Sequence, residues 1–590
     1  MFTNIMKKDH AHLLLRTFEL GAIFLWLSNL VDTNSYFSVY CLCAMAALFC
    51  FYDSEKKGDS LHGKDLGTAV TLSILFGFLV TAANYPIFQQ IRNPAEVSAG
   101  SNRLMNLLEC VATFLGGIPV CYHLLQWLYC RVEGNDLPVL SKPVEGKKPF
   151  VFFLWVFGIL AMIDMIYLFL VDYPGSISHD SLRQIEQTVT GEYNNVLPYW
   201  YTRLIGFVLS MGYGIFGDPN RACAFYSFLQ LLAMTAIFAY TLLTLYERKV
   251  SRLFLSLAFV FYAFVPYNIA FSTSMWKDVL FTGFVLLMVT AQYRCLKKLG
   301  NSKANLAMMI LGGIGVGIMR TNGWYVVALS FLILLLCGKE IRRTLALGMA
   351  AASLAGFLLN VPVLKIMDVP GLDKVETMSL PIQQIARVIV KERELNSDDL
   401  ALLNEIVDVD RIPEVYQDWT SDPMKNMVSQ KNPQFIENNL GEFLGLWIKL
   451  GLQHPMDYLE AWVELTKGYW NGGYDYYIYA EYVADNDYGI FMDQSMNPIK
   501  ALVKAYFAFS RESVVFEPIL SIGLQVWITI ACWWVCGIRK KKETVLFIPL
   551  LVILAGLWVG APVFSEFRYA YPVAAAVPLV LTAALERKGQ

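Results

Sequence analysis

The sequence predicts an all-α polytopic membrane protein. Hydrophobic residues make up 56% of its 590 residues. They fall in blocks long enough to cross a hydrocarbon core, which takes about 20 residues each. Lysine and arginine gather in short clusters that can all be placed on one side of a membrane. The formal net charge of −2 gives no reason to expect binding to nucleic acid.

The apolar blocks predict about 14 transmembrane helices. Short loops join most of them, and two long polar segments interrupt the series. The predicted spans are residues 12–31, 36–52, 66–86, 107–129, 150–171, 221–246, 253–271, 278–295, 304–319, 323–337, 343–360, 516–537, 545–561 and 570–585.

The basic clusters orient these spans. With the N-terminus inside, every cluster falls in a cytoplasmic loop, and the C-terminus is cytoplasmic too. No small-residue cleavage site follows the short basic start of the chain, so the first span is predicted to be retained. The clusters are Lys7–Lys8, Lys56–Lys57, Arg131 with Lys147–Lys148, Arg248–Lys249–Arg252, Arg294 with Lys297–Lys298, Lys339 with Arg342–Arg343, Arg539–Lys542 and Arg587–Lys588.

The same orientation places both long polar segments, Asp172–Asn220 and Val361–Val515, outside. The apolar stretch Tyr199–Tyr213 cannot cross the membrane, because crossing would put Arg248–Lys249–Arg252 outside. We therefore expect a helix that lies in the interface. The residues predicted to face lipid are Trp200, Leu204, Phe207, Val208 and Met211.

Four regions follow from this division of the chain. Residues 1–149 form an N-terminal four-span addition, and residues 150–360 form a transmembrane core with a first external loop at 172–220. Residues 361–515 are an external, partly helical domain with helices expected at Pro381–Leu395 and Pro455–Lys467, and residues 516–590 hold the last three spans.

The 11 cysteines lie in or beside apolar blocks, and the two external segments have none. A cysteine-free external part needs no disulfide chemistry, which favours a bacterial plasma membrane. The sequence has no Cys/His metal spacing, no Walker glycine loop and no Rossmann glycine loop. It indicates no cofactor, and a requirement for a divalent metal stays open.

Asp180 stands in the first external loop, just after a span leaves the membrane. A carboxylate in that position can orient or deprotonate an acceptor hydroxyl. The alternative is that Asp180 caps a short helix whose Leu182, Ile185 and Val189 share one face. Glu186 and Glu192 in the same loop are more typical of solvated surface.

Isolated cations also occur on the predicted outer side. Lys277 stands beside Asp278, Arg320 lies between two spans, and Arg568 precedes the last span. Ammonium and guanidinium groups at headgroup depth can bind a phosphate. They can equally serve as interfacial anchors whose charged ends reach the lipid headgroups.

Two further features have open roles. The aromatic region Gly468–Tyr488 can stack on sugar rings, but it can also be the core of an external domain, which we favour. Asp164 lies inside a predicted span, where an ionisable group is costly and needs a partner.

In their order along the chain these motifs resemble the GT-C superfamily of integral membrane glycosyltransferases, which use polyprenyl-phosphate sugars. Protein mannosyltransferases and the aminoarabinose transferases of lipid A belong to it, and the resemblance is to an uncharacterised bacterial branch. It covers roughly Phe150–Gln590. The motifs that carry it are Tyr173-Pro-Gly175 followed by the loop with Asp180, Asn195–Thr202, Ile215-Phe-Gly217 with Arg221, Trp276-Lys-Asp278, Arg320-Thr-Asn322 and Glu566–Pro572.

The resemblance implies a GT-C-like bundle that moves a sugar to an envelope glycan, lipid or protein at the outer face. It implies that Asp180 is the catalytic residue and that Lys277, Arg320 and Arg568 hold the donor phosphate. Leu197 stands where many relatives have histidine, and the four N-terminal spans have no counterpart. The candidate contacts to acceptor or sugar are His179, Gln184, Glu186, Asp278, Asn322 and Tyr569.

Two other functions remain open at this stage. A transporter or flippase of lipid-linked sugars would have polar sites at the membrane midplane and internal pseudo-symmetry. A non-catalytic envelope assembly protein would tolerate replacement of Asp180. Membrane lipid is an expected partner in all three cases.

Overall fold

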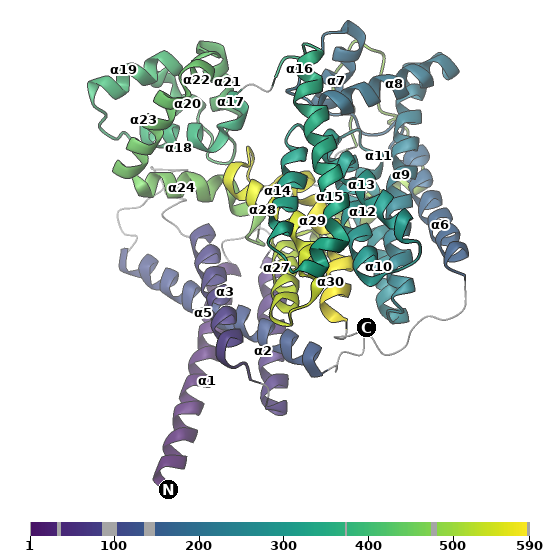
Figure 1. Ribbon diagram of the computed structural model, residues 1–590. Coiled ribbons are helices and arrows are strands. Elements are labelled where there is room, and N and C mark those ends of the chain that lie inside the picture. Colours follow the sequence, from purple (N-terminus) through teal and green to yellow (C-terminus); the bar gives the residue numbers. More distant parts are fainter. Residues whose placement is uncertain are drawn as a thin grey trace.

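The computed structural model describes residues 2–31, 37–58, 60–84, 103–134, 148–371, 374–473 and 481–586 (Figure 1). Within these residues the elements are helices, and β-structure is limited to isolated bridges. The longer helices are α1 (Phe2–Val31), α2 (Phe37–Lys57), α3 (Gly63–Asn84), α5 (Arg103–Gly134), α6 (Pro149–Leu170), α7 (His179–Thr190), α8 (Tyr199–Phe216), α9 (Pro219–Glu247), α10 (Arg252–Phe264), α11 (Pro266–Thr273), α12 (Lys277–Lys297), α13 (Ser302–Met319), α14 (Gly323–Leu335), α15 (Lys339–Asn360), α18 (Ser379–Val390), α19 (Ser397–Ile406), α21 (Asp422–Lys431), α23 (Leu440–Gln453), α24 (Pro455–Thr466), α25 (Pro498–Glu512), α27 (Ile522–Ile538), α28 (Ile548–Gly560), α29 (Phe567–Ala575) and α30 (Val577–Leu585).

Ten helices of the described chain are long and apolar enough to cross a membrane, and the bent pair α10–α11 raises the number to eleven. The chain is therefore an all-α polytopic membrane protein. The three remaining predicted spans fall on α1, α14 and α27, which are helical, and α14 and α27 are apolar but shorter than the qualifying helices. The prediction of 14 spans is thus supported in part.

Helices α1, α2, α3 and α5 pack together and form what we call the N-terminal module. It stands beside the main bundle, and α1 extends away from it (Figure 1). Trp26 is the centre of its core and contacts Tyr40 and Phe76 through their rings. Gly116 and Gly117 allow this close packing, since a Cβ on either would meet Trp26 or the backbone of a neighbouring helix.

The main bundle consists of α6, α8–α15 and α27–α30. Helix α12 lies at its centre, and it packs against α9, α13 and α29. Almost every α12 residue from Asp278 to Arg294 is buried. A helix that is apolar and enclosed on all sides needs neighbours on all sides, which makes α12 the axis of the fold.

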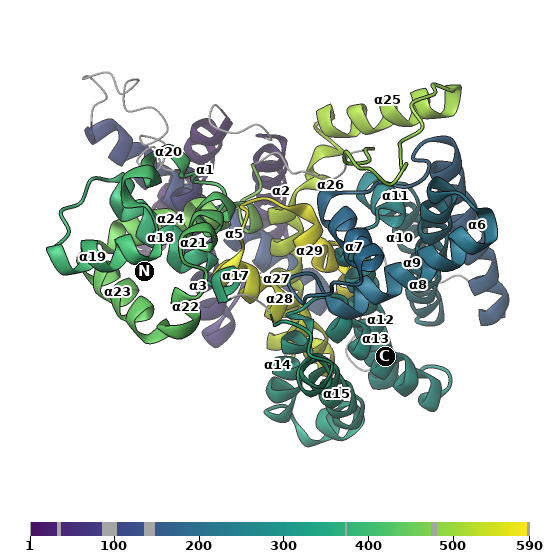
Figure 2. The ribbon, with the colours of Figure 1, turned by 90° about the horizontal axis from the view of Figure 1, so that it is seen from above.

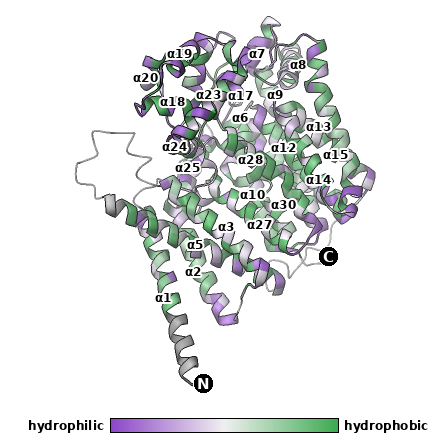
Figure 3. Ribbon diagram, turned by 60° about the vertical axis from the view of Figure 1, so that its left-hand side comes forward, coloured by the Kyte–Doolittle hydropathy of each residue, from purple (hydrophilic) through white to green (hydrophobic). Residues whose placement is uncertain are grey.

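A separate domain with its own hydrophobic core is formed by α17–α24, from Lys374 to Thr466. It lies above the N-terminal module in Figure 1, and its helices alternate between hydrophilic and hydrophobic residues in Figure 3. Helices were predicted at Pro381–Leu395 and Pro455–Lys467, and α18 and α24 occupy those positions. The domain is smaller than the predicted 361–515, because the α15 helix continues through α16 (Pro362–Ile366) and α25 lies elsewhere.

Helix α25 lies on the far side of the molecule from the α17–α24 domain (Figure 2). Its Phe507 packs against Tyr167 and Val171, while Leu502 is exposed. Helix α8 is also absent from the described helices that qualify as spans. Of its predicted lipid-facing residues, Phe207 and Met211 are exposed, but Val208 is buried in the main core, so that part of the expectation was wrong.

Candidate functional site

Six charged side chains meet at one end of the bundle and alternate in sign. We call them the charge ladder. They come from four separate parts of the chain: the start of α7, the start of α12, the end of α13 and the start of α29. The ladder consists of Lys277, Asp180, Arg568, Asp278 and Arg320, with Glu566 as a side branch on Arg568.

The contacts of the ladder are close. Lys277 Nζ lies 3.0 Å from Asp180 Oδ2, and Arg568 Nη1 lies 3.4 Å from the same oxygen. Arg568 Nη1 is also 4.0 Å from Asp278 Oδ2, and Arg320 is ion-paired with Asp278 Oδ1. Arg568 Nε donates to Glu566 Oε2 at 3.1 Å. One arginine therefore touches all three carboxylates.

Aromatic rings support the two guanidinium groups. Arg568 lies 5.2 Å from the ring centre of Trp276 and 5.1 Å from that of Tyr569. Arg320 lies 5.0 Å from the centre of the Tyr569 ring and also lies over Phe281. Such cation–π contacts hold a guanidinium in place while leaving its N–H groups able to bind an acid.

Backbone and side-chain hydrogen bonds join the start of α7 to the start of α12. Ser181 Oγ of α7 donates to Met275 O at 2.5 Å, and Met275 N donates to Ser176 O at 2.9 Å. Gln230 of α9 donates to Ser274 O at 2.7 Å. These bonds fix the start of α7 against the turn that begins α12, and so bring Asp180 to Lys277.

The segment Pro562–Ser565 positions the start of α29. Phe564 N donates to Trp419 O at 3.0 Å, and Ser421 N donates to Pro562 O at 2.9 Å. Gly468 packs so closely against this segment that a Cβ would lie 2.0 Å from Phe564 O. The α17–α24 domain thereby fixes the position of Glu566 and Arg568, although it contributes no charge to the ladder.

The ladder separates two cavities. The smaller has a volume of about 280 Å³ and is lined by Asp180, Glu566 and Arg568, with His179, Ser178, Trp276 and Tyr482. The larger has a volume of about 650 Å³ and has Arg320, Asn322 and Tyr569 at its polar end. Its other wall is apolar and follows α14 and α28 through Leu329, Val552, Ile553 and Leu557.

The two carboxylates of the smaller cavity have opposite electrostatics. Lys277, and then Arg568, hold the pKa of Asp180 well below its ordinary value, against the effect of burial. Burial raises the pKa of Glu566 above its ordinary value, and Arg568 opposes this only in part. Two carboxyl groups with divergent pKa values in one cavity are typical of acid–base sites.

Asp278 is fully buried, and its Oδ2 has no hydrogen-bond partner within the described part of the chain. A buried carboxylate oxygen without a hydrogen bond is rare in folded proteins. Asp278 lines neither cavity, and its Oδ2 faces Arg568 within the ladder.

Residues 177–590 match the model of a family described as "Family of unknown function (DUF6020)". The chain belongs to this family. The match begins three residues before Asp180 and includes every residue of the charge ladder, whereas the N-terminal module lies outside it. No curated protein and no solved structure matches the chain.

Of the site residues predicted from sequence, the structure brings Asp180, Lys277, Arg568, Asp278 and Arg320 together. The expected alternative for Asp180, a helix cap, was wrong: Ser178 is the N-cap of α7, and its side chain accepts from Ser181 N. Asp180 is the second residue of the helix, and a third of its side chain is exposed.

The weaker candidates divide into two groups. His179 lines the smaller cavity, and Asn322 and Tyr569 line the larger one. Gln184 is buried, lines neither cavity, and donates to Thr202 of α8 at 3.0 Å, which joins α7 to α8. Glu186 is exposed and lines neither cavity.

Sequence reasoning missed three residues of the site. Glu566 was noted only as part of a motif, although its position two residues before Arg568 at a helix start was a usable signal. Trp276 was noted in the same way. Tyr482 reaches the smaller cavity because its backbone pairs with Ile177, which no pattern in the sequence indicates.

Tyr469 and Trp470 of the aromatic region are fully buried, but in the core of the main bundle, so the expectation that they belong to the core of the external domain was wrong. Tyr474, Tyr476, Tyr477 and Tyr479 lie outside the described residues. Asp164 is buried beside Ser272, which supplies a hydrogen bond. In the part of the chain that the structure describes, no group of three or more His, Cys, Asp or Glu residues is placed to hold a metal.

Proposed function

We propose that this protein transfers a glycosyl group from a polyprenyl-phosphate sugar to an acceptor at the outer face of a bacterial plasma membrane. The observation that carries the proposal is the larger cavity. It has an arginine at one end and an apolar wall along two membrane helices, a combination that suits a phosphate joined to a hydrocarbon tail.

In this proposal Arg320 binds the donor phosphate, and the first turn of α14 adds backbone N–H groups beside it. From Gly560 to Val552 the wall of α28 follows the helix for about 12 Å, at 1.5 Å per residue. The tail lies against this wall and against α14. The sugar then projects across the ladder towards Asp180.

The acceptor occupies the smaller cavity. Its hydroxyl oxygen attacks the anomeric carbon, the bond from that carbon to the phosphate oxygen breaks, and polyprenyl phosphate leaves. Asp180 takes the hydroxyl proton. Fixed cations stabilise the charge that grows on the phosphate. No water takes part as acceptor.

The ion pairs of Asp180 imply that the donor must bind before Asp180 can act as a base. While Lys277 and Arg568 hold Asp180, it is a weak base, because its pKa is low. In the proposal, a donor phosphate held by Arg320 also attracts Lys277 and Arg568. As they turn to the phosphate, Asp180 regains basicity, so the base becomes active only when donor is bound.

The direct test is to reconstitute the purified protein in nanodiscs with a panel of polyprenyl-phosphate sugars and an acceptor extract from bacterial envelopes. Release of polyprenyl phosphate that requires both acceptor and Asp180 supports the proposal. Movement of a lipid-linked sugar between leaflets without release of polyprenyl phosphate would favour a flippase instead.

The placement at the outer face has its own test. Single cysteines introduced beside Asp180 are expected to react with a membrane-impermeant maleimide in intact cells, and a cysteine at Lys540 is expected to react only after lysis. Labelling of position 540 from outside would reverse the proposed orientation.

A further inference from the structure

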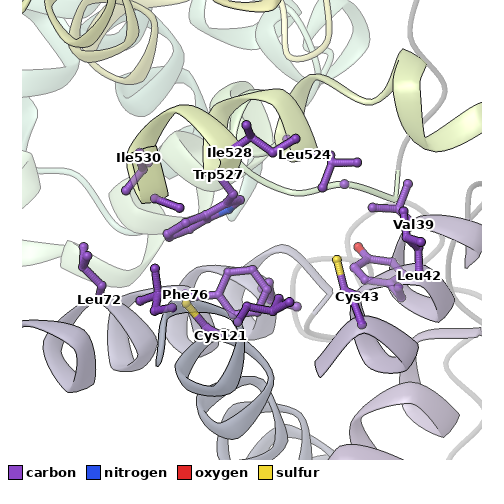
Figure 4. A pocket seen from close by; sticks show the side chains of 18 of the residues that line it. Val39, Leu42, Cys43, Leu72, Phe76, Cys121, Leu524, Trp527, Ile528 and Ile530 are labelled. Carbon is purple, nitrogen blue, oxygen red and sulfur yellow. The ribbon is translucent and has the colours of Figure 1, made fainter. Parts of the chain in front are cut away.

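A second apolar cavity, with a volume of about 470 Å³, lies between the N-terminal module and α27, and no residue of the ladder lines it. Helices α2, α3 and α5 form one wall and α27 forms the other. The segment Trp470–Gly472 closes one end. In Figure 4 the side chains of Phe76 and Cys121 face Trp527 across the cavity. The rings of Phe76 and Trp527 meet edge to face at 4.9 Å.

Polar contacts join the module to the bundle at both ends of this cavity. At the site end, Tyr40 Oη donates to Asn471 Oδ1 at 2.8 Å. At the opposite end, Trp534 Nε1 donates to Thr68 Oγ1 at 3.0 Å. The module is thus attached at its two ends, and the cavity occupies the interface between them.

The depth of the cavity matches one leaflet of a bilayer. On α2 its lining positions run from Val39 to Cys50. At 1.5 Å per residue this is about 17 Å. Half of a hydrocarbon core is about 15 Å. Since α2 is long and apolar enough to span the membrane, the long axis of the cavity follows the membrane normal.

An empty cavity at this depth is unfavourable. Its walls lose dispersion contacts, and the bilayer offers no water to fill it. What surrounds the protein there is hydrocarbon. The lining contains no lysine or arginine among the described residues, and its polar groups at the site end, Tyr40 and Asn471, are bonded to each other. The cavity therefore suits a hydrocarbon chain and does not suit a phosphate group.

From this geometry we infer that the cavity binds one acyl chain of a bilayer glycerophospholipid, and that this lipid joins the N-terminal module to the family body. The inference goes beyond glycosyl transfer and does not depend on it. The acyl chain in this cavity is distinct from the tail of a polyprenyl donor, which has its own apolar wall on α14 and α28.

The test uses nanodiscs that contain phosphatidylethanolamine with a diazirine at the end of one acyl chain. After illumination, we expect adducts on peptides of α2, α3, α5 and α27. A double variant, Ala46→Phe with Ala531→Phe, places aromatic rings in the cavity from opposite walls. It should lose adducts about tenfold, because excluding two methylene groups from an apolar site is enough for that loss.

The matched control is Met45→Phe, which adds an aromatic ring to the neighbouring, exposed position on α2 and should leave labelling unchanged. Native mass spectrometry of the unaltered protein provides a measurement that does not depend on the variants, and a retained phospholipid is expected. The inference is overturned if the filled variant labels like the parent, if no phospholipid is retained, or if a diazirine-bearing polyprenyl phosphate labels these helices in place of the phospholipid.

Discussion

Two networks of ion pairs join distant segments of this chain, one at each end of α12. Lys277 at the start of the helix belongs to the charge ladder, and Lys297 at its end belongs to a network around Glu586. The two lysines are 20 residues apart, about 30 Å along a helix. Both networks combine charges from segments that the sequence keeps far apart.

The network around Glu586 is closed. Glu586 Oε1 accepts from Arg248 Nε at 2.6 Å and from Tyr293, and its Oε2 lies 2.8 Å from Lys297 Nζ. Lys297 also pairs with Glu543 at 2.6 Å. Glu586 and Glu543 are buried, and this network lines none of the cavities described above. Its geometry suits stability: it fixes the end of α30 against α9 and α12.

The charge ladder differs in one way, because it borders two cavities. Each network leaves one buried carboxylate oxygen without a hydrogen bond among the described residues, Asp278 Oδ2 in the ladder and Glu586 Oε2 in the other network, so an unmet hydrogen bond does not distinguish them. The comparison teaches that ion pairing alone does not identify a site, whereas ion pairing beside open volume does.

The largest expected effect is on transfer. Asp180→Asn keeps the shape of the side chain and removes its basicity, so the rate of polyprenyl phosphate release should fall by about 10²–10⁴-fold. Glu186→Gln, an exposed change on the same helix, should leave the rate unchanged. Thermal unfolding is measured beside activity. A folded Asn variant with the parental rate would exclude Asp180 as the base.

At the opposite end, Glu586→Gln should cost stability and leave the site intact. It deprives Arg248 and Lys297 of a buried carboxylate, and breaking such a pair costs about 3–5 kcal/mol. We expect a lower unfolding temperature in detergent and an unchanged Kd for polyprenyl phosphate. If the variant keeps parental stability but binds polyprenyl phosphate more weakly, the Glu586 network takes part in donor binding, and the contrast between the two networks is wrong.

Arg320→Ala should weaken binding of polyprenyl phosphate by about one to two decades, because a charge-assisted hydrogen bond contributes about 1.5–3 kcal/mol. It also removes the closest partner of Asp278. The double variant Arg320→Ala with Asp278→Asn removes that orphaned charge, and it should regain stability without regaining affinity. Recovery of donor binding in the double variant would show that Arg320 only neutralises Asp278 and does not bind the donor.

The smallest effect concerns pH. Burial raises the pKa of Glu566 above its ordinary value of 4.5, so on acidification it loses its charge earlier than an ordinary carboxyl group. Neutral Glu566 no longer holds Arg568, and activity should fall as pH drops through that raised pKa. In Glu566→Gln this acid limb should disappear from the profile of kcat/KM against pH, with a plateau reduced by less than about tenfold. If the fall in activity at low pH is unchanged in Glu566→Gln, a different group is responsible for it.

The helical membrane architecture could be predicted because apolar blocks act locally. A block of about 20 apolar residues becomes a helix in a bilayer whatever surrounds it, since its backbone must satisfy its own hydrogen bonds. Isolated charges at block ends likewise identified Asp180, Lys277, Arg320 and Arg568 as candidates, because each stands where an ordinary surface charge would be costly.

The sequence by itself determined the helical membrane class and the identity of most ladder residues. The tertiary structure decided which of them meet. Gln184 points to α8, Ser178 takes the cap position, and Glu566 reaches Arg568 because segments near 420 and 468 hold the start of α29. The physical reason is that these contacts join residues separated by as many as 388 positions, as in the pair of Asp180 with Arg568. Hydrophobic pattern and charge spacing specify neighbours along one helix, and only packing of whole helices specifies neighbours between them.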